Sequence, residues 1–162
     1  MDAYNVLLGE ILIQRKNITR SQLEEALALQ KKGRCAHRNG QAASPFWNEL
    51  ENDFIGEILV KLGYLDERDI VVALVIQLGL PYIAVNKYAI DPAIVRLIPL
   101  EVAQKERVIA LDRIGDILSV VMINPLTQEK KEFLESLTRC SIVTFISTKT
   151  EIQEAIARHY RT

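Results

Sequence analysis

Few residues of this chain have the types and spacings that perform chemistry. Cys35 and His37 form a single Cys-x-His pair with no second pair at zinc-site spacing, so a solvated loop explains them better. His159 ends the last helical pattern, where the helix dipole favours a cation, so we expect a capping role. The sequence contains no G-x-x-x-x-G-K-[ST] loop, no G-x-G-x-x-G turn and no G-x-S-x-G elbow. The sequence therefore predicts a protein that is not an enzyme.

The most regular feature of the chain is a segment that occurs twice, at an offset of 47 residues. The recurring identities are Gly9 with Gly56, Glu10 with Glu57, Ile11 with Ile58, Leu12 with Leu59, Ala26 with Ala73, Leu27 with Leu74 and Gln30 with Gln77. Where the residues differ, apolar character is kept, as at Leu23 and Ile70. A fixed offset indicates a duplicated supersecondary unit. Two copies cannot form a solenoid, so we expect a paired helical module with a site or groove between the copies.

Composition and charge exclude several classes of protein. The net charge of −1 over 162 residues argues against a nucleic-acid-binding domain, which normally carries a basic face. No apolar run reaches the roughly 18 residues of a membrane span, and no signal-peptide pattern precedes Leu7, so we expect no direct membrane insertion. Cys35 and Cys140 are isolated and fit free thiols in a reducing compartment. We expect a cytoplasmic protein without a metal or resident cofactor.

The first half of the chain reads as helices only. Apolar spacing predicts a helix over residues 4–13, and Thr19 with Gln22 forms a capping box for the next helix. In the second copy, Gly63 is placed for a left-handed C-cap and Asp66 for an N-cap. Gly79 and Pro81 end the last of these helices.

A long connection separates the two copies. Residues 31–48 have no hydrophobic period and are basic and glycine-punctuated, which predicts a flexible loop. Within it, residues 33–44 should be mobile and should be cut first by a protease. Phe46, Trp47 and Leu50 are predicted to start the next helix, with the tryptophan as a packing anchor.

Beyond residue 80 the pattern changes to mixed α/β. Strands are predicted at 81–85, 107–111, 117–122 and 141–146. Helices are predicted after Asp91-Pro92, from Pro99, after Thr127 and after a capping box of Thr148 with Glu151. The sequence thus predicts an α+β fold. An all-helical subdomain over residues 1–79 (copies at 8–30 and 55–77) precedes a small α/β sheet subdomain over 80–162.

The residues around both glycines resemble the repeated motif of the MshEN-type domain. The likeness runs from Leu8 to Gln30, from Ile55 to Gln77, and on through Asp91-Pro92 and the predicted strands to His159-Tyr160. This domain occurs at the N-terminus of type II secretion and type IV pilus assembly ATPases, the family of the GspE N-terminal domain. The resemblance implies a non-catalytic regulatory and docking module whose partner is a secretion or pilus platform protein or the ATPase core.

In some members of that family the two repeats bind cyclic di-GMP, one repeat at each guanine end. Carried over, the ligand-facing residues are Leu8, Gly9, Leu23, Leu27 and Gln30 in the first copy and Ile55, Gly56, Ile70, Leu74 and Gln77 in the second. Glycine would permit close backbone approach, the aliphatic residues would offer guanine an apolar face, and glutamine would supply an amide. This interpretation places Gly9 near Gln30 and Gly56 near Gln77.

The sequence departs from the family's binding pattern at the first motif position. The family has arginine there, whereas this chain has Leu7 and Phe54, and neither replaces a charged bidentate donor. Lys32, Arg34 or Arg38 in the predicted loop would be the sources of compensating charge. The alternative interpretation is that the apolar repeat residues pack helices together and that both glutamines are exposed last-turn residues. We therefore expect partner docking as the main function and cyclic di-GMP reception as the alternative.

Overall fold

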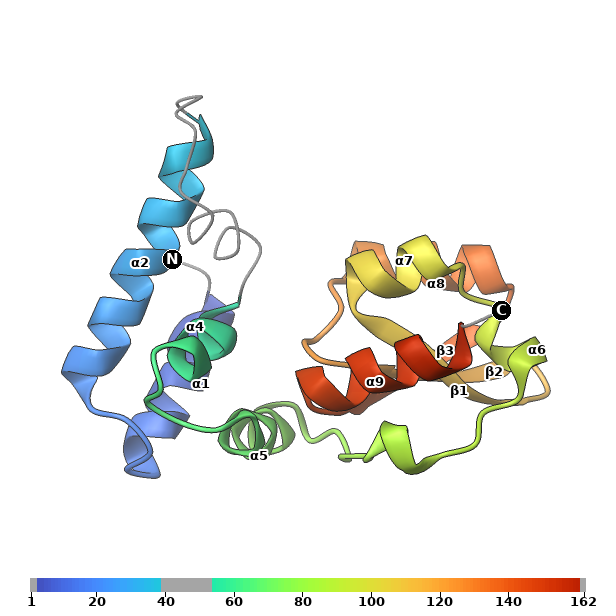
Figure 1. The fold of residues 1–162 in the computed structure, drawn as a ribbon, viewed down its shortest axis with the longest axis horizontal. Helices are drawn as coiled ribbons and strands as arrows, with labels where there is room; N and C mark the ends of the chain where they lie inside the picture. Colours follow the sequence, from blue (N-terminus) through green and yellow to red (C-terminus); the bar gives the residue numbers. More distant parts are fainter. Residues whose placement is uncertain (1–2, 39–53, 161–162) are drawn as a thin grey trace. The chain divides into compact units, whose positions relative to one another are not determined.

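The computed structural model describes residues 3–38 and 54–160 and divides the chain into two compact units (Figure 1). The first unit is Met1–Gln77 and the second is Leu78–Thr162. The sequence had placed the subdomain boundary between residues 79 and 80.

The first unit is helical throughout its described residues. It contains α1 (Ala3–Gln14), α2 (Arg20–Arg38), α4 (Ile55–Lys61) and α5 (Glu67–Leu78), with α2 packed against α4. The predicted helix pairs are therefore present in both copies. We call α1 with α2 copy 1, and α4 with α5 copy 2.

Helix α2 is longer than the sequence pattern predicted. It continues through Arg38, so the prediction of a loop beginning at residue 31 is wrong for residues 31–38. Lysine and arginine are good helix formers and suit the C-terminal end of a helix dipole, whereas Gly33 costs only about 1 kcal/mol in a helix interior. The rest of the predicted mobile stretch, and Phe46, Trp47 and Leu50, lie outside the described residues.

The second unit is a three-stranded sheet with helices packed on it. Its strands, β1 (Val108–Ile114), β2 (Ile117–Met122) and β3 (Ser141–Ile146), lie in the order β1-β2-β3. The β1–β2 hairpin is antiparallel, whereas β3 runs parallel to β2 after a crossover through α8 (Gln128–Thr138). The remaining elements are η1 (Val85–Lys87), α6 (Pro92–Val95), α7 (Leu100–Glu106) and α9 (Lys149–His159).

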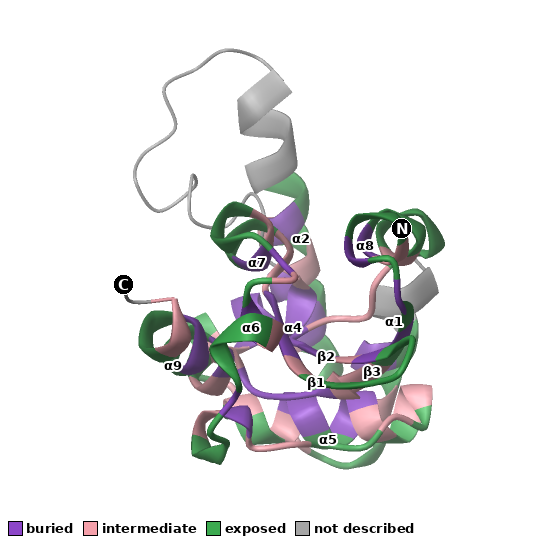
Figure 2. Ribbon diagram, turned by 90° about the vertical axis from the view of Figure 1, so that its right-hand side faces the viewer, coloured by how far each residue is buried: buried purple, intermediate pink, exposed green. Residues whose placement is uncertain are grey.

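The core of the second unit lies on both faces of this sheet. Consecutive residues are buried in β1 (Val108–Ala110) and in β2 (Val120–Met122), so side chains of both faces are covered. Figure 2 draws the buried parts of the ribbon in purple. Helices α6, α7 and α9 contact β1, and α8 contacts β3. The predicted α+β fold, with helices first and a small sheet second, is confirmed.

The strand predicted at residues 81–85 is wrong. Only Tyr82 forms a bridge, to Ile146, and a 3₁₀ turn begins at Val85. Proline has no amide N–H to donate, so Pro81 only accepts a bond, from the Ile146 N–H, while the Ile83 N–H donates to the Ile146 carbonyl. Too few backbone groups of this segment are hydrogen-bonded to β3 for it to form a further strand of the sheet.

The predicted caps of the second unit are present. Asp91 accepts a hydrogen bond from the Ala93 N–H at the start of α6, and Thr127 caps α8. At α9, Thr148 and Glu151 form the reciprocal capping box. Desolvation would raise the pKa of Glu151, but hydrogen bonds from Tyr82, Ser147 and Thr148 outweigh it and lower that pKa.

Three further expectations can be compared with the described residues. None of the helices in the two described ranges has the length and apolarity that a membrane crossing requires. Within the same residues no three His, Cys, Asp or Glu side chains cluster where they would hold a metal ion. Cys140 is buried as a free thiol.

Candidate functional site: the duplicated helix pair

The repeated glycines lie where the two helices of each copy touch. A Cβ atom added to Gly9 would stand 2.5 Å from Cδ2 of Leu23, and one added to Gly56 would stand 3.0 Å from Cδ1 of Ile70. Leu23 and Ile70 occupy the same position of the repeat and are buried. The glycine of each copy therefore leaves room for the aliphatic side chain of its own second helix.

The turns between the paired helices repeat each other bond for bond. In copy 1 the N–H groups of Arg15, Lys16 and Asn17 donate to the carbonyls of Ile11, Ile13 and Leu12. In copy 2 those of Leu62, Gly63 and Tyr64 donate to Ile58, Val60 and Leu59, each 47 residues further on. Both turns place their middle residue in the left-handed region, Lys16 at φ 61° and Gly63 at φ 72°. The duplication thus extends from sequence to backbone hydrogen bonding.

The starts of the second helices also repeat. The Thr19 N–H donates to Oε1 of Gln22 at 2.8 Å, and the Asp66 N–H donates to Oδ2 of Asp69 at 3.1 Å. These are equivalent positions, with glutamine in one copy and aspartate in the other. Thr19 Oγ1 also accepts from the Gln22 N–H at 3.3 Å, so the capping box predicted at Thr19 is confirmed. At the start of α5 the Asp69 side chain caps the Asp66 N–H, and a cap by the Asp66 side chain stays a prediction.

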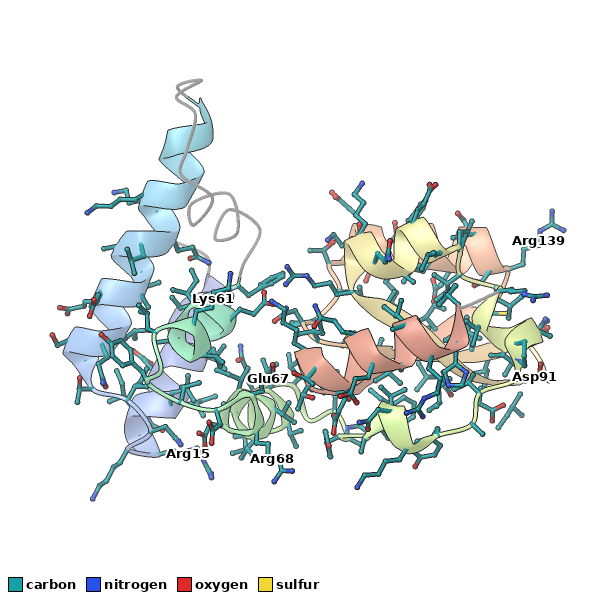
Figure 3. The ribbon with its side chains drawn as sticks, viewed as in Figure 1. Arg15, Lys61, Glu67, Arg68, Asp91 and Arg139 are labelled. Atoms are coloured by element: carbon teal, nitrogen blue, oxygen red, sulfur yellow. The ribbon has the colours of Figure 1, made fainter. Side chains whose placement is uncertain are left out.

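Equivalent turn residues join each copy to the other. Nδ2 of Asn17 donates to Oδ1 of Asp69 in α5 at 2.8 Å. In copy 2 the Tyr64 hydroxyl donates to Oε2 of Glu25 in α2 at 2.5 Å. Asn17 and Tyr64 are 47 residues apart, so the donors of these reciprocal bonds occupy the same repeat position, whereas the acceptors Asp69 and Glu25 do not. Arg68 directly precedes Asp69 in sequence, and Arg15 precedes Asn17 by two residues (both arginines are labelled in Figure 3).

Sequence reasoning did not identify this reciprocal pair. A signal was present, because Asn17 and Tyr64 occupy the same repeat position and both carry a polar hydrogen-bonding group. Their partners could not be read from the sequence, since that requires knowing how the copies pack. The bond to the Glu25 carboxylate is the largest cause of a raised pKa at Tyr64, followed by desolvation and the charge of that carboxylate.

Most of the ligand-facing residues inferred from the family resemblance are buried in the helix packing. The buried ones are Leu8, Gly9, Leu23, Gln30, Ile55, Gly56, Ile70 and Leu74. Leu27 and Gln77 are half-buried. Gln30 lies in the interior of α2 rather than in a last turn and is only 5 % exposed, so the alternative that it is an exposed last-turn residue is wrong.

The structure brings together only part of the predicted site. Each glycine meets the aliphatic residue of its own copy, as described above. Gln30 follows Leu23 by seven residues, which places it about 10 Å further along α2 at 1.5 Å per residue. The proximity of Gly9 to Gln30 and of Gly56 to Gln77 stays a prediction.

The two positions where the family carries arginine differ from each other. Leu7 is 51 % exposed on α1. Phe54 is half-buried and caps α4, where its N–H donates to Oε2 of Glu57 at 3.2 Å. Neither side chain bears a charge, and Lys32 lies exposed on α2 rather than in a loop.

Comparison with known protein families identifies the family of this chain. The family model of the MshEN domain matches residues 78–162, more than half of the chain. The chain belongs to the MshEN domain family. The matched stretch covers the α/β unit, whereas the two helical copies lie before it.

Relatives of this MshEN-family chain are pilus ATPases. It is 33 % identical over 153 residues to the type IV pilus assembly ATPase PilB of Myxococcus xanthus, and 32 % identical over 108 residues to PilB of Thermus thermophilus. These alignments cover 94 % and 65 % of the chain. The chain spans only 24 % and 12 % of the lengths of those relatives.

Two solved structures resemble nearly the whole chain. The structure of MshE with cdg has a TM-score of 0.70 at 25 % identity and covers 94 % of this chain and 98 % of that one. The N-terminal domain of XpsE has a TM-score of 0.72 at 15 % identity and covers 99 % of each chain. The second likeness concerns the fold alone.

Proposed function

We propose that this MshEN-family chain is a non-catalytic docking module that binds a partner protein of a type IV pilus or type II secretion machine. The observation that carries the proposal is the burial of the repeat residues. The glycines and aliphatic residues of both copies are occupied by packing between the helices. Because these residues are packed inside, we expect docking to use the outer faces of the paired helices.

Similarity to pilus assembly ATPases also supports a docking function. The chain is about one third identical to two pilus assembly ATPases, of which it spans a quarter or less. A regulatory or docking part of such a machine does not itself require a phosphate-binding loop, and the sequence has none. The proposed partner is the cytoplasmic domain of an inner-membrane platform protein or the ATPase core.

A second candidate function is reception of cyclic di-GMP by the two copies. The specific observation in its favour is the likeness to MshE with cdg, which extends over nearly the whole of both chains. Against it stand the uncharged Leu7 and Phe54, because a guanine edge or a phosphate is best held by a bidentate arginine. We therefore rank ligand reception below docking.

Biolayer interferometry with the cytoplasmic domain of the platform protein from the same genome tests the docking function. We expect saturable binding to the folded chain, weakened by charge-reversing substitutions on exposed positions of one unit. Matched substitutions on the other unit serve as the control. Failure of both the platform domain and the ATPase core to bind the folded chain would contradict the proposal.

A further inference from the structure

Strand β3 has a composition that favours pairing with further strands. Its six residues, Ser141–Ile146, are rich in isoleucine, valine, threonine and phenylalanine and include no charged residue, proline or glycine. β3 also lies at one edge of the sheet, because the strand order is β1-β2-β3. An uncharged segment of this kind at a sheet edge is a place where another chain can add a strand.

The outer edge of β3 is hydrogen-bonded at its C-terminal end. The Ile146 N–H donates to the Pro81 carbonyl at 3.0 Å, and the Ile146 carbonyl accepts from the Ile83 N–H at 2.9 Å. Alternate residues of a strand face the same edge, so Thr144 also turns its N–H and C=O outward. One step back along this ladder the Thr144 carbonyl would need the N–H of residue 81, which proline lacks. Within the described part of the chain, both Thr144 backbone groups stay without a hydrogen bond.

A side chain closes the start of the same edge. Glu135 of α8 is half-buried, and its Oε1 accepts from the Ile142 N–H at 3.1 Å. Ile142 precedes Thr144 by two residues, so this N–H belongs to the outer edge. A carboxylate can only accept hydrogen bonds, and this one occupies the place that a carbonyl of an added strand would take. Charged side chains at such places are a means by which proteins keep edge strands from pairing.

The backbone groups left on this edge are self-complementary. If two copies of β3 pair antiparallel about a two-fold axis at Val143, Ile142 of each copy faces Thr144 of the other. Residues that face each other in this way exchange both N–H···O=C bonds. Val143, which is 46 % exposed, would face its own counterpart across the axis. The bonds of Ile146 are not disturbed in this register, because Ile146 lies beyond the paired residues.

We propose that the outer edge of β3 is a pairing surface for a second copy of this chain, and that Glu135 keeps this surface closed. The register above supplies backbone bonds and a valine contact, whereas Glu135 withholds the Ile142 N–H. An added strand would also bring a carbonyl oxygen against the carboxylate, which is unfavourable because neither group donates. The inference goes beyond the docking function, since it concerns the association of copies of the chain with each other.

Three variants separate the edge bond from other effects. Glu135→Ala removes the acceptor of the Ile142 N–H. Glu132→Ala is the matched control, because it removes the same charge from α8, where Oε1 of Glu132 accepts from Nε2 of Gln128 at 2.8 Å rather than from β3. Adding Val143→Lys to Glu135→Ala places two like charges opposite each other on the axis, at an exposed position.

Sedimentation velocity of the full chain over a concentration series measures self-association. We expect Glu135→Ala to associate about tenfold more tightly than wild type, since a charge-assisted hydrogen bond no longer competes with strand pairing. Glu132→Ala should behave as wild type, and the added Val143→Lys should return Glu135→Ala to wild-type behaviour. Far-ultraviolet circular dichroism checks that each variant is folded. Unchanged association of folded Glu135→Ala, or association that survives Val143→Lys, would overturn the inference.

Oxidative cross-linking tests the register, on a Cys35→Ser background in which Cys140 is buried. In the proposed register the two Cα atoms at position 143 lie about 4.5 Å apart, within the reach of a disulfide, whereas position 141 faces position 145 of the other copy. Val143→Cys should therefore form a cross-linked dimer and Ser141→Cys should not. The same Val143→Cys change should cross-link more slowly with Glu135 present than in Glu135→Ala. Equal cross-linking at positions 141 and 143, or a rate indifferent to Glu135, would contradict the proposal.

Discussion

At the turn between its two helices, copy 1 holds Lys16 in the left-handed region, whereas copy 2 has Gly63 there. The backbone hydrogen bonds of the two turns are the same. At the contact between the paired helices, the copies differ in the room beside the glycine. A Cβ atom added to Gly9 would stand 2.5 Å from the Leu23 side chain, whereas one added to Gly56 would stand 3.0 Å from the Ile70 side chain. The two copies therefore keep one backbone design while differing in strain and in packing tolerance.

This comparison shows which features of the repeat are structural. Identical residues at the glycine, alanine and leucine positions serve the shared backbone and packing. The positions that differ, such as Asn17 and Tyr64, carry the bonds between copies. The substitutions below test each of these differences.

The largest expected effect is the contrast between Gly9→Ala and Gly56→Ala. Gly9→Ala should lower the free energy of unfolding by about 1–2 kcal/mol, because overpacking outweighs the gain in helix propensity. Gly56→Ala should stay within about 0.5 kcal/mol of wild type, since Ile70 needs to move only slightly. Urea unfolding followed by far-ultraviolet circular dichroism measures both.

A double variant checks the cause of the first effect. Leu23→Ala in the Gly9→Ala background removes the clashing side chain, so the two losses should sum to more than the double variant loses. Strictly additive losses would mean that Gly9 and Leu23 are not in contact, and the packing account of the repeat would be wrong.

The turn residues should show a smaller effect of opposite sign in the two copies. Gly63→Ala should destabilise the chain by about 1 kcal/mol, because no atom lies near the added Cβ and only the left-handed backbone is strained. Lys16→Gly should stabilise it by about 0.5 kcal/mol as that strain is relieved against the entropy of glycine. Hydrogen exchange of the α1 and α4 amides reports the two changes locally, and equal protection in both variants would remove the proposed asymmetry.

The smallest effect concerns the Tyr64 bond and appears as a pH dependence. The pKa of Tyr64 is raised in the folded state. The stabilisation of the fold by the Tyr64–Glu25 hydrogen bond is therefore complete below the ordinary tyrosine pKa and is lost as the pH rises through the pKa of the folded state. Tyr64→Phe should remove one late step from the phenolate absorbance titration. Tyr160, whose pKa burial raises to about 12, keeps its own step and serves as the internal reference.

Local signals in the sequence account for much of this fold. Thr127, Thr148 and Glu151 cap α8 and α9 within one turn of sequence, so the helix starts were predictable. The strand predicted after Pro81 failed because a strand needs distant partners, and only one bridge forms. The extension of α2 through Arg38 carries no hydrophobic period, and only the helix propensity of its lysine and arginine residues indicates it.

The site was predictable to a smaller degree. The repeat itself pairs Gly9 with Gly56 and Leu23 with Ile70, and the structure shows that each glycine lies against the aliphatic residue of its own copy. The bonds between copies depend on the packing of α2 against α4, which no local pattern encodes. A cavity in the second unit likewise joins residues of α7, of α9 and of the segment after β2, which share no sequence signature.

Calorimetric titration with cyclic di-GMP tests most directly the claim that the copies keep the family's packing without its arginine-dependent ligand contacts. We predict weak or undetectable binding to the wild-type chain. Loss of two bidentate contacts of about 1–3 kcal/mol each would weaken affinity by roughly 30- to 25,000-fold if the losses add. The double variant Leu7→Arg with Phe54→Arg should raise any residual affinity. A sub-micromolar dissociation constant for wild type, abolished by Gln30→Ala, would contradict the account.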